Sequence, residues 1–418
     1  MRVLMVSWEY PPVVIGGLGR HVHALATELA AAGHDVVVLT RHPAGSDATT
    51  HPTSDATAEG VRVLRVAEDP AHLEFVRDMV AWTLAMGHAM VRAALTRLQG
   101  WSPDVVHAHD WLVAHPAIAL ADVLGVPLVA TIHATEAGRF NGWLSSPTSR
   151  QVHSTEWWLA NRADTVITCS AAMRAEAAEL FDLDPEPIAV LHNGIEPRGW
   201  RVPRRRVAAA REHFGPGGEP LLLYFGRLEY EKGVHDLVAA LPRIRRAHPG
   251  TRLLVAGTGT ATGLLDDAVR THRVRRSVDF LGHLPDADLA ALLSAVDAVV
   301  LPSRYEPFGI VALEAAAAGA PLVASRAGGL GDIVVDGVSG VSFPPGDVPA
   351  LARAVGSVLA DPAAARRRAR TARTRLGAEF DWTRIAAGTA EVYARAEAGG
   401  PQELPRPKIP SGNVFGRG

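Results

Sequence analysis

The sequence predicts two α/β domains, each built on a doubly wound, Rossmann-like parallel sheet, that face one another across a cleft. Its 418 residues exceed what one hydrophobic core usually supports, which favours two domains of about 200 residues each. Short β-branched runs alternate with longer Ala- and Leu-rich stretches of helical period, the pattern of βα units in a parallel sheet. The alternation stops at a basic, Pro- and Gly-containing stretch over residues 197–220, which we interpret as an interdomain connection, and then starts again.

Each β-branched run is taken as one strand of these sheets. The first half is predicted to hold strands at residues 3–7, 36–39, 61–66, 105–108, 128–132, 166–168 and 188–191. The second half is predicted to hold them at residues 221–225, 253–256, 278–281, 298–301, 322–324 and 341–343. We therefore expect one domain over residues 1–196 and another over residues 197–380.

The C-terminal region is predicted to be helical and then to end in a tail. Residues 361–375 are rich in Arg and Ala, with Pro362 suited to a first helical turn, and Asp381 and Trp382 open a last helix. We expect that helix, over residues 381–397, to pack back on the first domain. Residues 398–418 contain many Pro and Gly and little to bury, which predicts a flexible tail.

Composition excludes several classes of protein. The 42 basic and 44 acidic side chains leave no charge excess of the kind that nucleic-acid binding needs. No apolar stretch is long enough to span a bilayer and no signal region precedes Glu9, so we expect a cytoplasmic protein. Cys169 is the single cysteine and ends an apolar run, which predicts a buried, unreactive thiol.

The first predicted βα turn contains Gly16, Gly17 and Gly19 just before a helix. Glycines allow a ligand to approach the backbone closely, and the free N–H groups of a helix start attract anions such as a pyrophosphate. The alternative, that these glycines only turn the chain, stays open.

Polar clusters follow two neighbouring strands of the first half. His109, Asp110 and Trp111 end one strand, and His133 and Glu136 follow the next. The carboxyl ends of parallel strands border the ligand crevice of an open sheet, so we expect a site there. A purely structural role for the histidines is the alternative.

Two cations follow the first strand of the second half. Arg227 and Lys232 lie on the loop that leaves it, where a guanidinium and an ammonium could hold a diphosphate together. The alternative is an exposed ion pair with Glu229 or Glu231.

A further group follows the strand at residues 298–301. Glu306 precedes a turn with Phe308, Gly309 and Ile310, whose amides open a helix, and Glu314 lies in the apolar surface of that helix. A carboxylate there needs a partner, for which ligand hydroxyls or a nearby basic side chain are the alternatives. The sequence contains no His-x-x-His metal motif, and we predict no metal site.

With these residues in place, the chain resembles glycosyltransferase family 4, retaining enzymes with the two-domain GT-B fold, over residues 1–397. The motifs that carry the resemblance are Gly16-Gly17-Leu18, His109-Asp110-Trp111, the loop of His133, Asn193-Gly194-Ile195, Gly226-Arg227-Leu228 with Glu231-Lys232-Gly233, and Glu306 with Glu314. More narrowly, Val6-Ser7-Trp8-Glu9-Tyr10-Pro11-Pro12 and residues 108–116 are similar to actinobacterial glycogen-synthase-like α-1,4-glucosyltransferases of methylglucose lipopolysaccharide synthesis.

The resemblance implies roles for these residues. The first domain would hold the acceptor and the second the nucleotide sugar. Donor-binding residues would be Gly16, Gly17, Arg227, Lys232, Glu306, Phe308, Gly309, Ile310 and Glu314, with Arg227 and Lys232 on the pyrophosphate and Glu314 on the ribose. Catalytic residues would be His133, Asp110, Glu306, Arg227 and Lys232, and the acceptor side would carry His109, Asp110, Trp111 and Glu136.

The implied reaction moves glucose from UDP-glucose or ADP-glucose to the non-reducing end of an α-1,4-glucan or methylglucose oligosaccharide, with retention and without a metal or other cofactor. Val14 and Ile15 stand where bacterial glycogen synthases carry Lys-Thr, so one lysine contact with the donor phosphate is not expected. Hexosyl transfer to a lipid or small acceptor, a GT-B epimerase and a non-catalytic nucleotide-sugar module remain alternatives. The donor base is not readable from these motifs, and a homo-oligomer is compatible with all of them.

Overall fold

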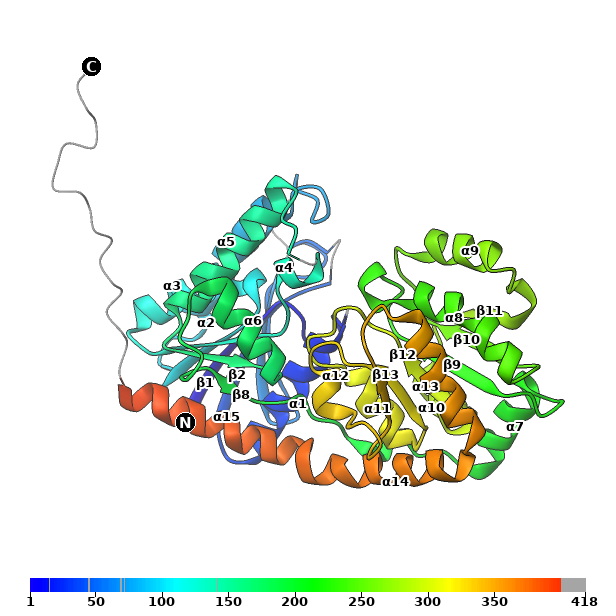
Figure 1. The fold of residues 1–418 in the computed structure, drawn as a ribbon. Coiled ribbons are helices and arrows are strands. Elements are labelled where there is room, and N and C mark those ends of the chain that lie inside the picture. The colour runs from blue at the N-terminus through cyan, green and yellow to red at the C-terminus, as the bar shows by residue number, and fades with distance from the viewer. Residues whose placement is uncertain (15, 44–45, 68–69, 71, 141, 400–418) are drawn as a thin grey trace, which may run out of the picture.

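The computed structural model describes residues 1–14, 16–43, 46–67, 70, 72–140 and 142–399. It contains two parallel sheets side by side, each flanked by helices (Figure 1). Both predicted sheets are therefore confirmed. Most of the expected tail, residues 400–418, lies outside the described residues. Among the described helices none is long and apolar enough to cross a bilayer.

The first sheet has the strand order β3-β4-β2-β1-β5-β6-β7-β8. Its strands are β1 (Arg2–Ser7), β2 (Asp35–Arg41), β3 (Ser54–Ala58), β4 (Val61–Val66), β5 (Val105–His109), β6 (Leu128–Ile132), β7 (Thr165–Thr168) and β8 (Ala189–Val190). All neighbours are parallel except β3 and β4. The sequence analysis missed β3, because its residues are all exposed and lack an apolar pattern. The strand is held at the sheet edge by pairing with β4 and by two hydrogen bonds from Arg62 to Asp55.

Helices of the first half cover both faces of this sheet (Figure 1). They are α1 (Gly17–Ala31), α2 (Met79–Arg97), η1 (Trp111–Val113), α3 (Ala114–Leu124), α4 (Glu136–Arg139), α5 (Pro147–Arg162) and α6 (Ala171–Phe181). Helix α1 begins at Gly17, so Gly16 precedes the helix as predicted, whereas Gly17 and Gly19 lie in its first turn.

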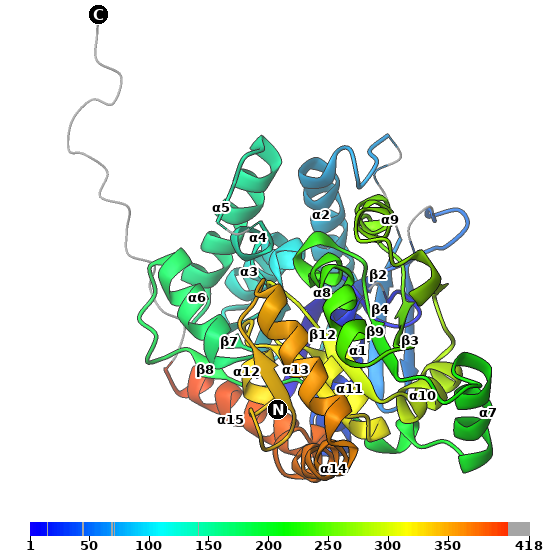
Figure 2. The ribbon, with the colours of Figure 1, turned by 45° about the vertical axis from the view of Figure 1, so that its right-hand side comes forward.

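The second sheet has the order β11-β10-β9-β12-β13-β14 and is entirely parallel. Its strands are β9 (Leu221–Phe225), β10 (Arg252–Ala256), β11 (Val278–Gly282), β12 (Ala298–Leu301), β13 (Leu322–Ser325) and β14 (Val341–Phe343). The other elements are η2 (Pro197–Trp200), α7 (Arg204–Phe214), η3 (Tyr230–Lys232), α8 (Val234–Ala247), α9 (Thr262–Thr271), η4 (Arg275–Ser277), α10 (Asp286–Ala295), α11 (Ile310–Ala318), α12 (Leu330–Ile333) and α13 (Val348–Ala360). Helices α8 and α13 pack together over one face (Figure 2).

One part of the predicted connection is wrong. The basic stretch contains α7, which packs on α10 rather than only linking the halves. Arg211 of α7 donates to the carboxylate of Asp297 at 2.7 Å and to the carbonyl oxygen of Ala295. The basic stretch that was interpreted as a linker therefore includes Arg211, which anchors α7 to the second half.

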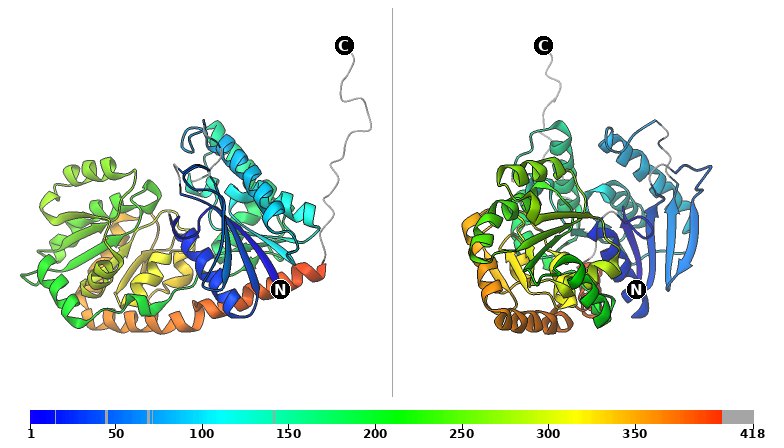
Figure 3. Two further views of the ribbon diagram at one scale, coloured as in Figure 1. Left: turned by 180° about the vertical axis from the view of Figure 1, so that it is seen from behind. Right: turned by 90° about the vertical axis from the view of Figure 1, so that its right-hand side faces the viewer.

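Two helices at the C-terminal end run beneath both halves of the molecule. Helix α14 (Pro362–Glu379) packs on α11, and α15 (Trp382–Gly399) crosses to the first half and packs on α1 and on the β5 and β6 strands (Figures 1 and 3). The hydroxyl of Tyr393 hydrogen-bonds Nδ1 of His107 at 2.7 Å. Where α14 ends, the carbonyl of Phe380 accepts a hydrogen bond from the amide of Ile195 at 2.9 Å. The two segments that connect the halves, near Ile195 and near Phe380, therefore lie side by side.

Candidate active site

The two halves touch through loops that follow the carboxyl ends of their strands. Ser170 donates to the carbonyl oxygen of Pro307 at 2.7 Å, and the hydroxyl of Tyr305 hydrogen-bonds the carboxylate of Glu176 at 2.8 Å. The sulfur of Cys169 lies 3.9 Å from the carbonyl oxygen of His133 and 3.6 Å from that of Pro307. The loops that contain His133 and Glu306 were predicted as site loops in different halves of the chain. In the structure they lie next to one another.

Asp110 and His133 are held together by the backbone. Asp110 has a positive φ of 63°, a strained conformation for a residue other than glycine. In that conformation its carboxylate accepts the backbone N–H of His133 at 2.7 Å. Burial raises the pKa of Asp110 to about 6, and backbone N–H groups of His133 and Ala134 oppose the rise. The carboxylate is therefore ionised at neutral pH and fixes the His133 loop.

His109 lies behind His133. Its side chain is fully buried, and its Nδ1 lies 3.2 Å from Nε2 of His133. Burial lowers the pKa of His133 to about 3 and that of His109 well below its usual value, so both rings are neutral. Because His109 is fully buried, its side chain does not face solvent in this structure.

Lys232 and Glu306 form an ion pair in the second half. Nζ of Lys232 donates to Oε2 of Glu306 at 2.9 Å, and Ser303 donates to the same oxygen at 3.2 Å. Both charged side chains are largely buried, 12% and 11% exposed, so removal of one leaves the other poorly compensated. Arg227 is about half exposed and lies 3.7 Å from Glu231, the surface pairing that the sequence analysis left open.

The glycines of the first loop allow a close approach between the halves. A Cβ atom on Gly17 would lie 2.7 Å from Cδ1 of Ile310, at the start of α11. The amide of Gly16 donates to the carboxylate of Glu9 at 3.1 Å. Gly309 has φ +105°, and its Cβ would lie 2.6 Å from Leu330. The paired glycines and the residues 308–310 therefore form adjoining walls.

Glu314 is paired across the cleft. Its carboxylate accepts from Nη1 of Arg20 on α1 at 2.9 Å. Burial raises the pKa of Glu314 to about 7, although Arg20 opposes the rise. Of the two partners considered for Glu314, the structure therefore shows the basic one: Arg20, from the other half of the molecule.

Trp111 and Glu136 lie at the edges of this arrangement. Trp111 begins η1 and is partly buried, directly after Asp110. The carboxylate of Glu136 accepts from Ser149 at 2.7 Å, and the amide of Glu136 donates to Glu156 at 2.8 Å. Glu136 therefore makes its hydrogen bonds to residues of the first half.

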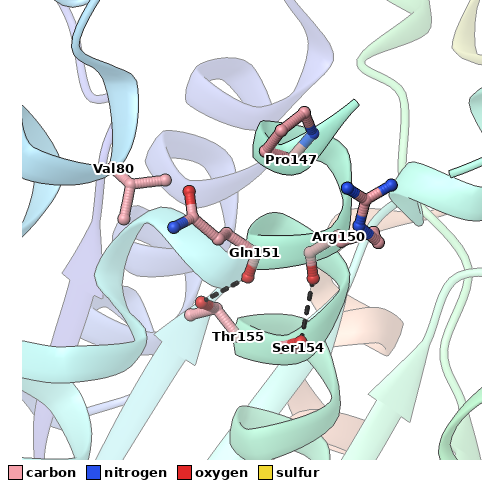
Figure 4. A pocket seen from close by; sticks show the side chains of 6 residues that line it. All are labelled: Val80, Pro147, Arg150, Gln151, Ser154 and Thr155. Atoms are coloured by element: carbon pink, nitrogen blue, oxygen red, sulfur yellow. Dashed lines mark hydrogen bonds between the residues drawn. The ribbon is translucent and has the colours of Figure 1, made fainter. Parts of the chain in front are cut away.

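A separate hollow of 430 Å³ opens between α2 and α5 (Figure 4). Val80 faces the first turns of α5, which supply the other side chains shown there: Pro147, Arg150, Gln151, Ser154 and Thr155. None of the predicted site residues lines it, so it does not compete with the cleft as the candidate site.

Several side chains at the cleft were missed in the sequence. Arg20, Tyr305 and Glu176 make contacts between the halves, and His21 lies beside His133 with ring centroids 4.7 Å apart. Each is far in sequence from its partner, so only the fold reveals the contact. Gly257 and Gly259 lie against the Arg227 loop, where a Cβ atom on either residue would come within 2.2 Å of a carbonyl oxygen.

Replacing Gly233 with alanine is expected to destabilise the fold and lower activity. Gly233 has φ +66°, and a Cβ there would lie 2.1 Å from the carbonyl oxygen of Pro302. The left-handed conformation alone costs roughly 1–2 kcal/mol, and the clash would move Lys232 from Glu306. Thermal unfolding followed by circular dichroism measures the loss. Gly377→Ala, at an exposed position inside α14 with no neighbour within 4 Å, should instead raise stability by about 0.5–1 kcal/mol; equal melting temperatures for the two variants would contradict the prediction.

The fold and the cleft define a class: two Rossmann-like domains with a cationic loop facing a histidine loop, as in glycosyltransferases with the GT-B fold. Residues 15–198 match the family model described as Glycosyltransferase Family 4, and residues 208–375 match the one described as Glycosyl transferases group 1. The chain belongs to glycosyltransferase family 4, and it is an enzyme that transfers a hexose from a nucleoside-diphosphate sugar.

Particular relatives narrow the comparison. The chain is 60% identical over 416 residues to the glycogen synthase of Mycobacterium tuberculosis (strain H37Rv), covering 98% of both chains. It is 31% identical to the α-maltose-1-phosphate synthase of Mycolicibacterium smegmatis, covering 95% of this chain and all of that one. Among solved structures, the sucrose-phosphate synthase of Thermosynechococcus elongatus superposes with a TM-score of 0.80 at 26% identity, over 95% of this chain and 99% of that one.

Proposed function

We propose that this enzyme transfers glucose, with retention, from a nucleoside-diphosphate glucose to the non-reducing end of an α-1,4-glucan. The observation that carries the proposal is the 60% identity with a glycogen synthase over nearly the whole chain. The glucan is glycogen or a methylglucose-type oligosaccharide, as the narrower sequence resemblance indicates. We also propose that residues 1–196 form the acceptor side and residues 197–380 the nucleotide side.

The cationic loop supplies the group that holds the leaving diphosphate. Lys232 lies next to Glu306, and Arg227 stands about half exposed at the same strand end. A fixed ammonium and a guanidinium stabilise negative charge as it develops on a leaving group. Glu306 orients the ammonium and, with the amides of Phe308, Gly309 and Ile310, binds the sugar.

The histidine loop supplies the opposite wall. Because Asp110 holds the backbone of His133, the His133 carbonyl has a fixed position beside the Glu306 loop. A fixed carbonyl dipole favours positive charge at the anomeric carbon. The acceptor hydroxyl attacks on the face that the diphosphate leaves, and a phosphate oxygen takes its proton, so the α configuration is retained and the diphosphate departs with that proton. Asp110 and Trp111 line the acceptor side.

The decisive experiment offers UDP-, ADP- and GDP-glucose, each with α-1,4-gluco-oligosaccharides. Release of nucleoside diphosphate that depends on the acceptor, with an α-1,4 linkage determined by NMR, is the expected result. A β linkage or another linkage position would contradict the proposal. Free sugar formed without an acceptor would identify an epimerase, and donor binding without turnover would identify a binding module.

Glu314 is proposed to accept hydrogen bonds from the donor ribose, which makes nucleotide affinity depend on pH. The ionised carboxylate accepts from two hydroxyls with both of its oxygens, whereas protonation turns one oxygen into a donor and removes the charge; burial raises the pKa of Glu314 in the free enzyme to about 7. Affinity is therefore expected to be full above pH 7 and to fall as the pH drops through that value, approaching about tenfold per pH unit. Calorimetric titration with nucleoside diphosphate from pH 5.5 to 8.5 measures this dependence.

Glu314→Gln is the matched control for the titration. It keeps the shape of the side chain but cannot titrate, so its affinity should be weaker throughout and lose the component centred near pH 7. If the variant shows the same pH profile as the wild type, Glu314 is not the group that binds ribose.

A further inference from the structure

Three histidines from distant parts of the chain converge at the base of the cleft. His21, on α1, joins His109 and His133, and each can offer a ring nitrogen so that the three nitrogens lie within 4.8 Å of one another. In the part of the chain that the structure describes, this is the one such group of potential metal ligands. Two of the rings, His21 and His109, are more than nine-tenths buried.

His21 has an unused ring nitrogen. Its Nε2 has no hydrogen-bond partner among the described residues. The remaining nitrogen of His21, Nδ1, lies 2.6 Å from Oδ1 of Asn193. The side-chain oxygen of Asn193 can only accept a hydrogen bond, so Nδ1 of His21 carries the ring proton. Nε2 of His21 then has a free lone pair. A second residue that fixes the tautomer in this way is typical of histidine metal ligands.

The spacing also suits a metal. Nδ1 of His109 and Nε2 of His133 are 3.2 Å apart, close to the separation of about 3.3 Å between two nitrogens that bind one tetrahedral zinc at about 2.0–2.1 Å. In the metal complex the ion would replace the proton that these two nitrogens share in the hydrogen bond. Three imidazoles with a free fourth position suit Zn²⁺ and similar divalent transition metals.

We propose that His21, His109 and His133 form a binding site for a divalent transition metal, with zinc as the reference ion. The ion would lie among the three rings, on the side of His133 whose Nε2 faces His109, with water as its fourth ligand. It would take no part in the transfer itself. The Asn193 of the Asn-Gly-Ile motif orients His21 in this site.

Binding is tested on the full-length protein with the metal alone. Zn²⁺ is titrated in competition with a chromophoric chelator, and Co²⁺ is added to the metal-free protein to record its visible absorption. We expect one ion per chain and the intense bands of four-coordinate cobalt. His21→Asn removes one ligand and should weaken zinc binding by at least about tenfold, the effect of losing even an outer partner of a metal ligand.

His23→Asn is the matched control. His23 lies on the same helix but outside the cluster, where it contacts Glu59, so zinc affinity should not change. Melting curves verify that both variants are folded, and the cobalt spectrum tests the wild-type site without any substitution. Absence of stoichiometric binding, a six-coordinate cobalt spectrum, or equal zinc affinity in His21→Asn and wild type would overturn the proposal. Failure of the proposed function is seen separately, as absence of glucosyl transfer in metal-free buffer.

Discussion

Replacing Lys232 with alanine is expected to lower the rate of glucosyl transfer about 10- to 150-fold. One charge-assisted hydrogen bond to the leaving diphosphate is worth about 1.5–3 kcal/mol, and this difference in activation free energy gives that range of rates. Lys232 is mostly buried beside Glu306, so a dissolved cation is not expected to take the place of its ammonium group. Initial rates at saturating donor and acceptor measure the effect on kcat, and Arg227→Ala should act in the same direction.

Two controls accompany this measurement. Arg367→Ala removes an exposed cation of α14, remote from the cleft, and should leave kcat unchanged. Circular dichroism must show that Lys232→Ala is folded, because the buried carboxylate of Glu306 loses its counter-ion in this variant. If the folded Lys232 and Arg227 variants both keep near-wild-type kinetics, the assignment of the diphosphate site is wrong.

Glu306→Gln is expected to lower kcat by roughly 100-fold or more, the size of effect seen when a preorganised group that stabilises transition-state charge is removed. The substitution keeps the shape of the side chain but removes the charge that orients Lys232 and faces the developing positive charge on the sugar. The affinity for nucleoside diphosphate alone should change much less, because Glu306 contacts the sugar in our proposal. Comparison of kcat with the calorimetric affinity for the nucleotide separates the two effects.

Ser303→Ala is the matched substitution for Glu306→Gln. It removes one hydrogen bond to the same carboxylate oxygen but leaves the charge and Lys232 in place, so kcat should fall only a few-fold. A loss as large as that of Glu306→Gln would show that local packing, and not the carboxylate charge, determines the rate.

The sequence predicted the strands well where burial imposes a pattern. The strand Leu221–Phe225 is apolar because both faces of its parallel sheet are covered, and the strand Val61–Val66 buries its four apolar residues; the predicted bounds of both strands match the structure. The exposed edge strand Ser54–Ala58 has no such pattern, because pairing with its neighbour holds it in place. Helix α7 was not predicted for a related reason: none of its residues is buried, so it has no apolar pattern.

The candidate site was predictable as separate loops but not as an arrangement. Strand-end loops with unusual polar residues pointed to His133, Asp110, Lys232 and Glu306 without any structure. The partners of these residues could not be found in this way, because Arg20 and Glu314 are separated by 294 positions and meet only across the cleft. The positive φ of Asp110 likewise could not be predicted from the sequence pattern.

Helix α15 has a consequence for biosynthesis. It covers the first sheet with residues such as Val392 and Tyr393, yet it is made more than 180 residues after that sheet's last strand, β8 (Ala189–Val190). The whole first half is therefore synthesised while α1, but not yet α15, covers this side of its sheet. The second half acquires α14 earlier, so the half that is translated later is the first to complete its packing. The nascent first half therefore exposes the apolar surface that α15 later covers until the end of translation, which is a period of aggregation risk.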